Sequence, residues 1–441
     1  MTTADAAPVV SPAVSSDRVR TIDIVRGLAV LGILVMNVVE FAWPDDAYTN
    51  PGYAGGSTGA DVWTWYLQTA LFDGKMRALF SMLFGAGIVL FAERLVAGGQ
   101  GARVADLLLR RCLWLVPFGI VHRFFLQWTG DILYQYGLLG ALAVAFRGLR
   151  PRTLIALGAV WLLAFVPIGL RRYAQVADTR TQAVEASRLQ AAGETVPEAL
   201  AQAQRRWQAR EKAIPPTPEA LQKEIAEVRV GYWQLFRNRW DYHHQFQSSF
   251  LYYHWVFDVL GMMWLGMGLL KVGFFHGQCR TAIYVVLLVA GGLVAAAQLA
   301  WALAWHATGF RTTELGLKLV YDLTHSHARA VTAIGWASAV ILVVRGGILR
   351  PWLHALEQVG RMAFSCYILQ TVVCSLLFFG YGFGLFGAVP RAWLMAVVVG
   401  VSLLQVVFCR LWLARFRQGP LEWAWRSLTW WRVEPVRIGP A

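Results

Sequence analysis

Charged side chains are scarce in this sequence. Only 15% of its 441 residues are Asp, Glu, Lys or Arg, whereas 57% are hydrophobic. A soluble globular domain carries roughly 25% charged residues, so this scarcity excludes an ordinary soluble fold, and the positive mean hydropathy agrees. The sequence therefore predicts an all-α, polytopic integral membrane protein that is a bundle of about ten transmembrane helices.

Cysteine is also sparse, with five residues and no CxxC pair, and each lies in or beside an apolar run. This usage argues against a disulfide framework and against a thiolate metal site. The HSH segment at 325–327 lacks further ligands at a recognisable spacing, so we expect no metal. A GxSxG elbow, a P-loop and a dinucleotide fingerprint are absent as well, so no local motif reveals a reaction.

The excess of positive charge does not indicate nucleic acid as a partner. The net charge is +14, but the arginines bracket the apolar runs and form no basic face on a folded domain. That distribution suits the lipid bilayer and its headgroups. Because the short loops on one side of the predicted bundle are richer in Lys and Arg, the positive-inside rule places both termini in the cytoplasm.

The apolar runs and the segments between them divide the chain. Each predicted span is near the ~20 residues that cross the hydrocarbon core. The predicted spans are 22–41, 76–96, 107–128, 131–147, 152–170, 249–270, 281–306, 327–345, 360–384 and 391–414. They divide the chain into four parts: a flexible cytoplasmic tail at 1–17, an N-terminal five-helix half at 18–170, a loop at 171–245, and a C-terminal five-helix half with a cytoplasmic tail at 246–441.

The 171–245 loop is polar and rich in Ala, Gln, Arg and Glu, and Pro215 and Pro216 divide it. We expect surface helices on the extracytoplasmic side. A structural cap over the bundle is the favoured interpretation, and a lid that binds an acceptor is the alternative.

Ionisable residues within the first span are candidates for function, because they are expensive inside a membrane. Asp23 and Arg26 are three residues apart and can pair on one helical face. Arg26 and Asn37 are eleven apart, which is three turns or about 16 Å on the same face. That face would line an interior, although a snorkelling anchor explains Arg26 equally well.

The third and fourth spans bring a histidine near a carboxylate. His122 lies within the third span, and Asp131 opens the fourth after a TGD turn. A histidine oriented by an acid can act as a general base. From spacing alone, a helix-capping role for Asp131 and a satisfied polar His122 remain the simpler interpretation.

Five segments resemble the YeiB family of bacterial inner-membrane proteins, whose C-terminal half is catalogued as a domain of unknown function. In order they are TIDIVRGLAVLGILVMNV, GKMRALFSMLFGAGIVL, HRFFLQWTGDILYQYGLLG, VGRMAFSCYILQTVVCSLLFFGYGFGLFG and RQGPLEWAWRSLTW. His122, Asp131 and Arg361 match the family's pattern. The resemblance covers nearly the whole chain except the tail and most of the 171–245 loop, and it implies a multi-pass protein of the bacterial inner membrane.

The N-terminal half is similar to the transmembrane acyltransferases, including the heparan-α-glucosaminide N-acetyltransferase group, through the Arg-x10-Asn spacing of Arg26 and Asn37. That resemblance implies a cytoplasmic acyl-CoA donor, such as acetyl-CoA, held with the help of Arg26, and an acyl-transfer point near Asn37. The lysosomal relatives carry their key histidine after the first span, but residues 38–75 contain none here. His122 would have to substitute.

The first hypothesis is therefore an acyltransferase. The acyl-CoA would enter beside Asp23 and Arg26, with Arg361 as a second phosphate contact or an anchor. His122 with Asp131 would deprotonate an acceptor hydroxyl or amine, and Asn37 would stabilise the oxyanion. A transporter or exporter of a small or lipidic solute is the alternative, and a structural or sensory membrane partner is a third. The acceptor (a sugar, a lipid or a small molecule), the acyl chain and homo-oligomer formation stay open.

Overall fold

The computed structural model describes residues 20–212, 215–248 and 255–438, so the predicted tail at 1–17 lies outside the described residues. The described chain is all-helical, and its one pair of bridged extended residues joins Phe416 to Arg437. Apolar runs this long bury their backbone polar groups, and a helix satisfies those groups within its own segment. The predicted all-α class is confirmed.

Within the described residues, six helical segments are long and apolar enough to cross a membrane. They are α1 (Arg20–Ala42), the Gly59–Ala97 segment, the Pro151–Ala191 segment, α14 (Thr281–Ala307), α15 (Leu315–Gly346) and α18 (Arg391–Leu413). A seventh is present if α16 (Arg350–Arg361) and α17 (Ala363–Phe378), which meet at an angle of 86°, form one broken span. By length and composition, the molecule is a multi-pass helical membrane protein.

Three of the ten predicted spans coincide with none of these seven segments in the described chain. The 107–128 segment is broken into α5 (Val104–Leu113), α6 (Leu115–Ile120) and the π-helical η3 (Val121–Phe125). Pro117 lies at this break, where it removes a backbone donor. Within 131–147, α7 (Leu133–Val144) spans about 18 Å. The 249–270 span begins outside the described residues and continues as α13 (Val256–Lys271).

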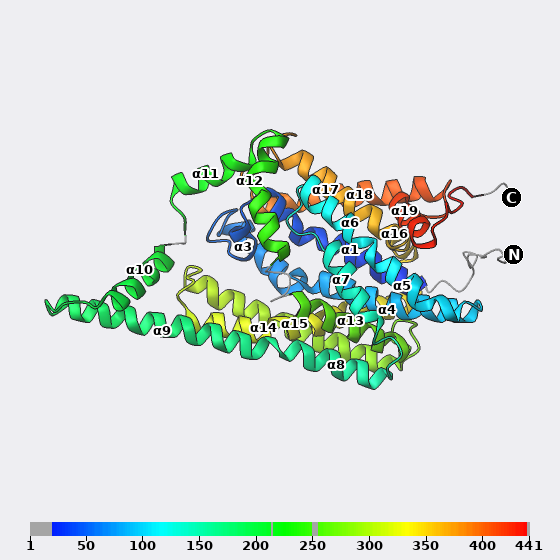
Figure 1. Ribbon diagram of the computed structural model, residues 1–441, viewed down its shortest axis with the longest axis horizontal. Coiled ribbons are helices and arrows are strands. Elements are labelled where there is room, and N and C mark those ends of the chain that lie inside the picture. Colours follow the sequence, from blue (N-terminus) through cyan, green and yellow to red (C-terminus); the bar gives the residue numbers. More distant parts are fainter. Residues whose placement is uncertain (1–19, 213–214, 249–254, 439–441) are drawn as a thin grey trace, which may run out of the picture.

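The segment that links the two halves is helical. The Pro151–Ala191 segment, which comprises α8 (Pro151–Leu163) and α9 (Phe165–Ala191), continues as helix through residue 170, where the apolar composition ends. It projects beyond the bundle, and α10 (Glu198–Lys212) folds back against it (Figure 1). The helices α11 (Pro218–Val228) and α12 (Tyr232–Gln245) then return along the bundle. Ala, Gln and Arg favour helix, so the change in polarity does not stop α9.

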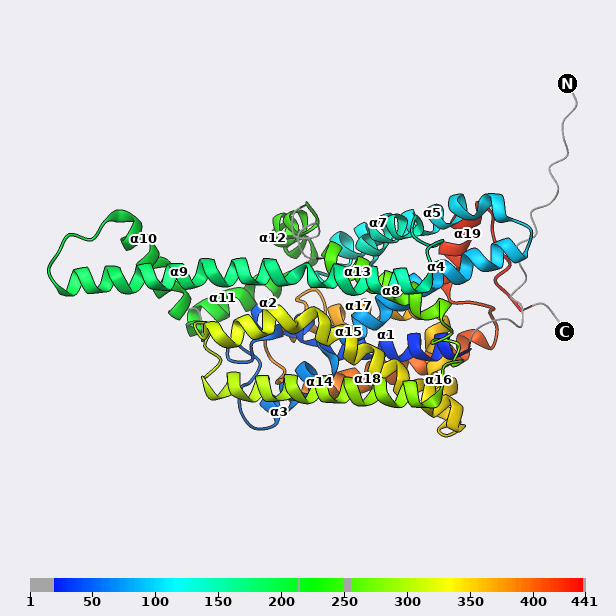
Figure 2. The same ribbon diagram turned by 90° about the horizontal axis from the view of Figure 1, so that it is seen from below.

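The remaining elements are the parts of the Gly59–Ala97 segment and several short pieces. They are α2 (Asp45–Thr49), α3 (Gly59–Leu67), the π-helical η1 (Gln68–Phe72), α4 (Lys75–Ala97), the 3-10 turn η2 (Gly101–Arg103) and α19 (Pro420–Trp430). The long helices α9, α14 and α15 run side by side, and α1 lies among α4, α16 and α18 (Figure 2).

Helix α1 packs against α16 with backbone in direct contact. A Cβ placed on Gly360 would lie 1.8 Å from the carbonyl oxygen of Asp23, and one on Gly27 would lie 1.9 Å from that of Leu356. Only glycine permits such an approach, which is how small residues bring membrane helices together. The contact fixes the first turns of α1 beside the end of α16, and so sets Arg26 near Arg361.

Candidate functional site

A cavity of about 490 Å³ is lined by residues of α1, α16 and α19. Figure 1 shows the start of α1 and helix α19 at the same end of the bundle. We call this cavity the arginine pocket. Its lining includes six guanidinium groups and two carboxylates. The arginines are Arg26, Arg94, Arg111, Arg361, Arg417 and Arg426, and the carboxylates are Asp23 and Glu422. This excess of positive charge suits an anionic ligand, and planar guanidinium groups match phosphate oxygens in pairs.

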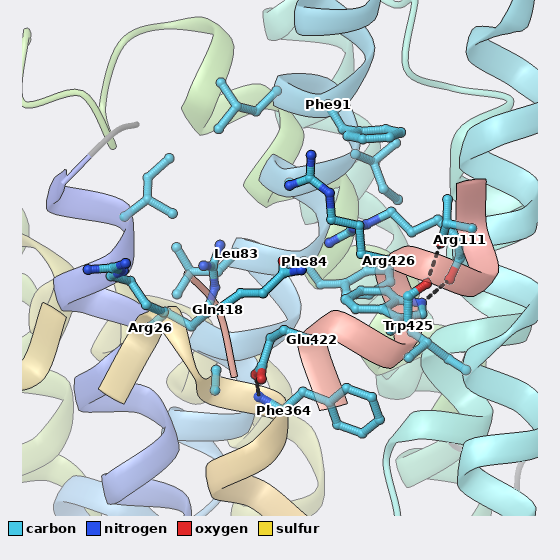
Figure 3. Close-up of a pocket in the computed structure, with 18 of the residues that line it drawn as sticks. Arg26, Leu83, Phe84, Phe91, Arg111, Phe364, Gln418, Glu422, Trp425 and Arg426 are labelled. Carbon is cyan, nitrogen blue, oxygen red and sulfur yellow. Dashed lines mark hydrogen bonds between the residues drawn. The ribbon is translucent and has the colours of Figure 1, made fainter. Parts of the chain in front are cut away.

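The arginines reach the pocket from different helices (Figure 3). Arg26 of α1 donates to Asp23 Oδ1 over 2.8 Å. Arg111 of α5 lies over the ring of Trp425, 3.8 Å from its centroid. The indole nitrogen of Trp425 in turn donates to the carbonyl of Arg111 over 2.7 Å. These contacts join α19 to α5, so the C-terminal helix completes a pocket that begins in the first span.

The bend between α16 and α17 supplies the floor of the same pocket. A bend of 86° leaves the first amides of α17 without helical partners. Glu422 of α19 accepts hydrogen bonds from the amides of Phe364, over 2.7 Å, and Ser365, over 3.1 Å. Desolvation raises the pKa of Glu422 above its ordinary value, although these hydrogen bonds oppose the effect. Glu422 therefore caps α17 and holds α19 against the bend.

The rest of the pocket lining is uncharged. Its walls are apolar and aromatic side chains from α4, α7 and α17, which include Phe80, Phe84, Leu133, Tyr136 and Tyr367. A ligand that fits both parts has an anionic head and an uncharged tail. The tail would reach Tyr367, whose ring centroid is 5.0 Å from that of His122.

His122 and Asp131 form a buried hydrogen-bonded pair. Nδ1 of His122 is 2.7 Å from Asp131 Oδ1, and Nε2 is 2.8 Å from the hydroxyl of Thr371. Asp131 also accepts from the amides of Leu133, at Oδ1, and Tyr134, at Oδ2, each over 3.1 Å. An ionised carboxylate only accepts, so Nδ1 donates to it, and in the neutral ring Nε2 is left as the acceptor. Asp131 thus caps α7 and orients His122 at once.

The structure groups most of the residues singled out from sequence. Asp23, Arg26 and Arg361 line the arginine pocket, and a guanidinium nitrogen of Arg361 donates to the carbonyl of Arg417 over 3.3 Å. His122 and Asp131 form the buried pair. Asn37 is half-buried on α1, and among the described residues no hydrogen bond joins it to either group.

Other residues of the site were not identified from sequence. The pattern of arginines at the ends of apolar runs explains Arg94, Arg111 and Arg417 as topology signals, and it contains no sign that they share a cavity. Tyr367 and Thr371 lie within an apolar run in which nothing marks them. Their only signal was the match of the surrounding segment to a family pattern.

A second cavity, of about 360 Å³, lies near the opposite end of the bundle between α2, α10, α14 and α15. Aromatic side chains such as Trp301 and Trp305 line it. Near its floor the guanidinium of Arg329 lies 3.6 Å from Asp73 and 3.9 Å from Asp258, which also pairs with Arg77. Three helices thus share a buried ionic network.

No three His, Cys, Asp or Glu side chains converge into a group that could hold a metal ion in the parts of the chain that the structure describes.

These features define a class: a multi-pass helical membrane protein with an arginine-lined pocket at one end and a buried histidine–aspartate pair behind it. Residues 269–432 match the family described as "Protein of unknown function (DUF418)". The chain is 31% identical to "Uncharacterized protein YeiB" of Escherichia coli (strain K12) over 93% of this chain and 95% of that protein. It therefore belongs to the YeiB family, as predicted from the sequence.

The similarity extends to other bacteria. "Uncharacterized protein YxaH" of Bacillus subtilis (strain 168) is 28% identical over 96% of this chain and 97% of its own. "Uncharacterized 39.9 kDa protein in amylase 3'region" of Bacillus acidopullulyticus is 25% identical over 97% of this chain and 98% of its own. No solved structure matches the chain.

Proposed function

We propose that this protein is a membrane-bound acyltransferase that takes an acyl group from acyl-CoA and delivers it to an acceptor hydroxyl or amine at or across the membrane. One observation carries the proposal. The lining of the arginine pocket includes Tyr367 beside its arginines, and the ring of Tyr367 lies against that of His122 in the buried histidine–aspartate pair.

The shape of an acyl-CoA supports the assignment of the donor. Its phosphates are anionic, its pantetheine arm is uncharged, and its thioester is at the far end of that arm. In the proposed complex, Arg26 and Arg361 contact the phosphates at the mouth. The arm follows the aromatic wall, and the thioester reaches the region of His122. The volume of the pocket is in the range of small-molecule sites.

His122 acts in this proposal as the general base, and Asp131 holds its ring and its tautomer. The full burial of both side chains keeps water from the thioester. Asn37, three turns along α1 from Arg26, donates a hydrogen bond to the oxyanion that develops on the acyl carbonyl. The acceptor is a sugar, a lipid or another small molecule.

The proposal includes a location. It places the chain in the bacterial inner membrane with about ten crossings, and it places the arginine pocket on the cytoplasmic side, where acyl-CoA is made available. The arginines at this end agree with the positive-inside rule. Cysteine labelling of Arg150→Cys, in the loop before α8, with a membrane-impermeant reagent distinguishes the two orientations.

The proposal is tested with purified protein in detergent and radiolabelled acetyl-CoA. Arg26→Ala removes a charge-assisted contact and is expected to weaken donor binding by about 10-fold to 100-fold. His122→Ala is expected to keep donor binding and to lose turnover. Arg150→Ala is the control, because this exposed arginine lies outside the pocket. The proposal would be refuted if the wild type neither bound nor turned over acyl-CoA at any of several chain lengths.

The buried ionic network supports a second candidate, a transporter or exporter of a small or lipidic solute. Paired charges inside a helical bundle can form part of a solute or proton pathway, and Asp73 lines the second cavity above them. A transporter would move a labelled solute into liposomes in the absence of any acyl donor. Asp258→Asn would stop that movement and leave acetyl-CoA turnover intact.

A further inference from the structure

The hydroxyl of Thr371 has an unusual partner. A threonine inside a helix commonly donates to the carbonyl four residues earlier. Other helix-borne threonines of this protein do so, namely Thr64, Thr179, Thr181, Thr324 and Thr429. Thr371 instead lies 2.8 Å from Nε2 of His122, a residue 249 positions away in sequence. The side chain is thus directed at the imidazole by the packing of α17 against η3.

Asp131, His122 and Thr371 form one chain of hydrogen bonds. The carboxylate holds Nδ1 over 2.7 Å, and Nε2 faces the hydroxyl over 2.8 Å. A nucleophile bonded to a base, which is in turn oriented by a third group, is the arrangement that activates a hydroxyl for attack on an acyl carbon. All three side chains are almost fully buried.

We propose that Thr371 is a covalent nucleophile that carries the acyl group between donor and acceptor. This inference rests on the acyltransferase function proposed above and adds an acyl-threonine intermediate to it. Thr371 lies one helical turn, about 6 Å, beyond Tyr367, the residue of α17 that closes the arginine pocket. Thr371 and His122 lie behind the lining of the pocket, and in the proposed complex the end of the donor passes Tyr367 to bring its thioester to the hydroxyl.

The two half-reactions balance. In the first, the Thr371 oxygen attacks the thioester carbon as its proton passes to Nε2 of His122, the carbon–sulfur bond breaks, and the CoA thiolate leaves with that proton. In the second, the acceptor hydroxyl or amine gives its proton to Nε2 and attacks the ester carbon. The carbon–oxygen bond to Thr371 then breaks, and the threonine oxygen regains a proton from His122.

The experiment incubates wild-type protein with radiolabelled acetyl-CoA without any acceptor, denatures it, and locates the label by mass spectrometry of the peptide containing residue 371. We expect CoA release of one equivalent per protein and one acetyl group on Thr371. Thr371→Ser keeps the hydroxyl and is expected to keep the label. Thr371→Val has the same shape but no hydroxyl, and is expected to lose the label and to lower transfer by roughly 100-fold or more.

Two further measurements keep the result interpretable. Binding of acetyl-CoA and the thermal midpoint are measured for each variant, since Thr371→Val leaves Nε2 of His122 without its partner. Thr332→Val is the matched control, because this buried hydroxyl of α15 has no hydrogen-bond partner among the described residues, and it is expected to retain label and activity.

Two outcomes would overturn the proposal, and they are distinguishable. Transfer by Thr371→Val at the wild-type rate, with no acetyl group on the wild-type peptide, removes the covalent step and leaves a direct transfer catalysed by His122. Absence of both CoA release and transfer in the wild type rejects the acyltransferase function itself, and the nucleophile with it.

Discussion

The carboxylate of Asp131 accepts three hydrogen bonds, from the His122 ring and from the amides of Leu133 and Tyr134. Its replacement by alanine leaves all three buried donors without a partner. Each unsatisfied donor costs about 1–3 kcal/mol, so Asp131→Ala is expected to cost ~3–9 kcal/mol of unfolding free energy. That is a large part of the net stability of roughly 5–15 kcal/mol that folded proteins have.

Asparagine at the same position has a smaller structural effect and a large chemical one. With its oxygen at the Oδ2 position it can still accept from the amide of Tyr134, but the amide of Leu133 loses its acceptor at Oδ1, so Asp131→Asn is expected to cost about 1–3 kcal/mol. Its NH₂ group, however, now faces Nδ1 of His122 and donates to it. The proton of the neutral ring then moves to Nε2, which donates to Thr371 and can no longer act as a base. We expect acyl transfer to fall by roughly 100-fold to 10,000-fold.

The assay compares both variants with Asp106→Asn, whose exposed carboxylate pairs with Arg110 one turn along α5. Thermal unfolding in detergent, followed by tryptophan fluorescence, measures stability, and labelled acetyl-CoA measures turnover. We expect Asp106→Asn to be the most stable of the three variants, Asp131→Asn to be less stable, and Asp131→Ala to be the least stable. Wild-type turnover by Asp131→Asn would refute the tautomer argument, and equal stability losses for the two Asp131 variants would refute the count of hydrogen bonds.

Three other predictions concern stability and packing. Desolvation raises the pKa of Glu422, so the folded protein keeps the carboxyl proton to a higher pH than the unfolded chain does. The free energy of unfolding therefore falls as the pH rises from the unfolded to the folded pKa of this group. Unfolding of Glu422→Gln, measured between pH ~4 and ~8, should show a smaller fall. Burial lowers the pKa of His243 to about 3 from its ordinary 6.5, so wild-type stability drops by a few kcal/mol on acidification, and acid titration of His243→Phe should remove much of that drop. Gly360→Ala places a methyl group 1.8 Å from the Asp23 carbonyl oxygen. It should lower the free energy of unfolding by about 1–3 kcal/mol and weaken donor binding. Gly400→Ala, whose methyl group meets nothing within 4 Å, should change neither the stability nor the donor affinity.

Composition and hydropathy were enough to predict the helical class, because a long apolar run can satisfy its backbone in a membrane only as a helix or within a barrel. They were not enough for the boundaries of the helices. The Pro151–Ala191 segment continues as helix past residue 170, since polar residues with high helix propensity extend a helix as readily as apolar ones. The break at α5–α6–η3 likewise depends on packing as well as on Pro117.

The site was only partly predictable for a different reason. Asp23 and Arg26 share a face by local helical spacing, which sequence reveals directly. The meeting of Arg26 with Arg111 and Trp425 depends on contacts between segments far apart in the sequence, such as the hydrogen bond between Trp425 and Arg111. In sequence, an arginine that only ends an apolar run cannot be told from one that faces a cavity. In the same way, a threonine that bonds to its own helix cannot be told from one that bonds to His122.

The length of the Pro151–Ala191 segment has a practical consequence. Its 41 residues measure about 60 Å along the axis, twice the ~30 Å of the hydrocarbon core. Half of this rod therefore stands clear of the lipid and carries α10 at its tip. Small membrane proteins hidden in a detergent belt offer few landmarks to electron cryo-microscopy. An antibody fragment raised against the α9–α10 hairpin would be coupled to the bundle through a continuous helix, and would give particle images a fixed direction.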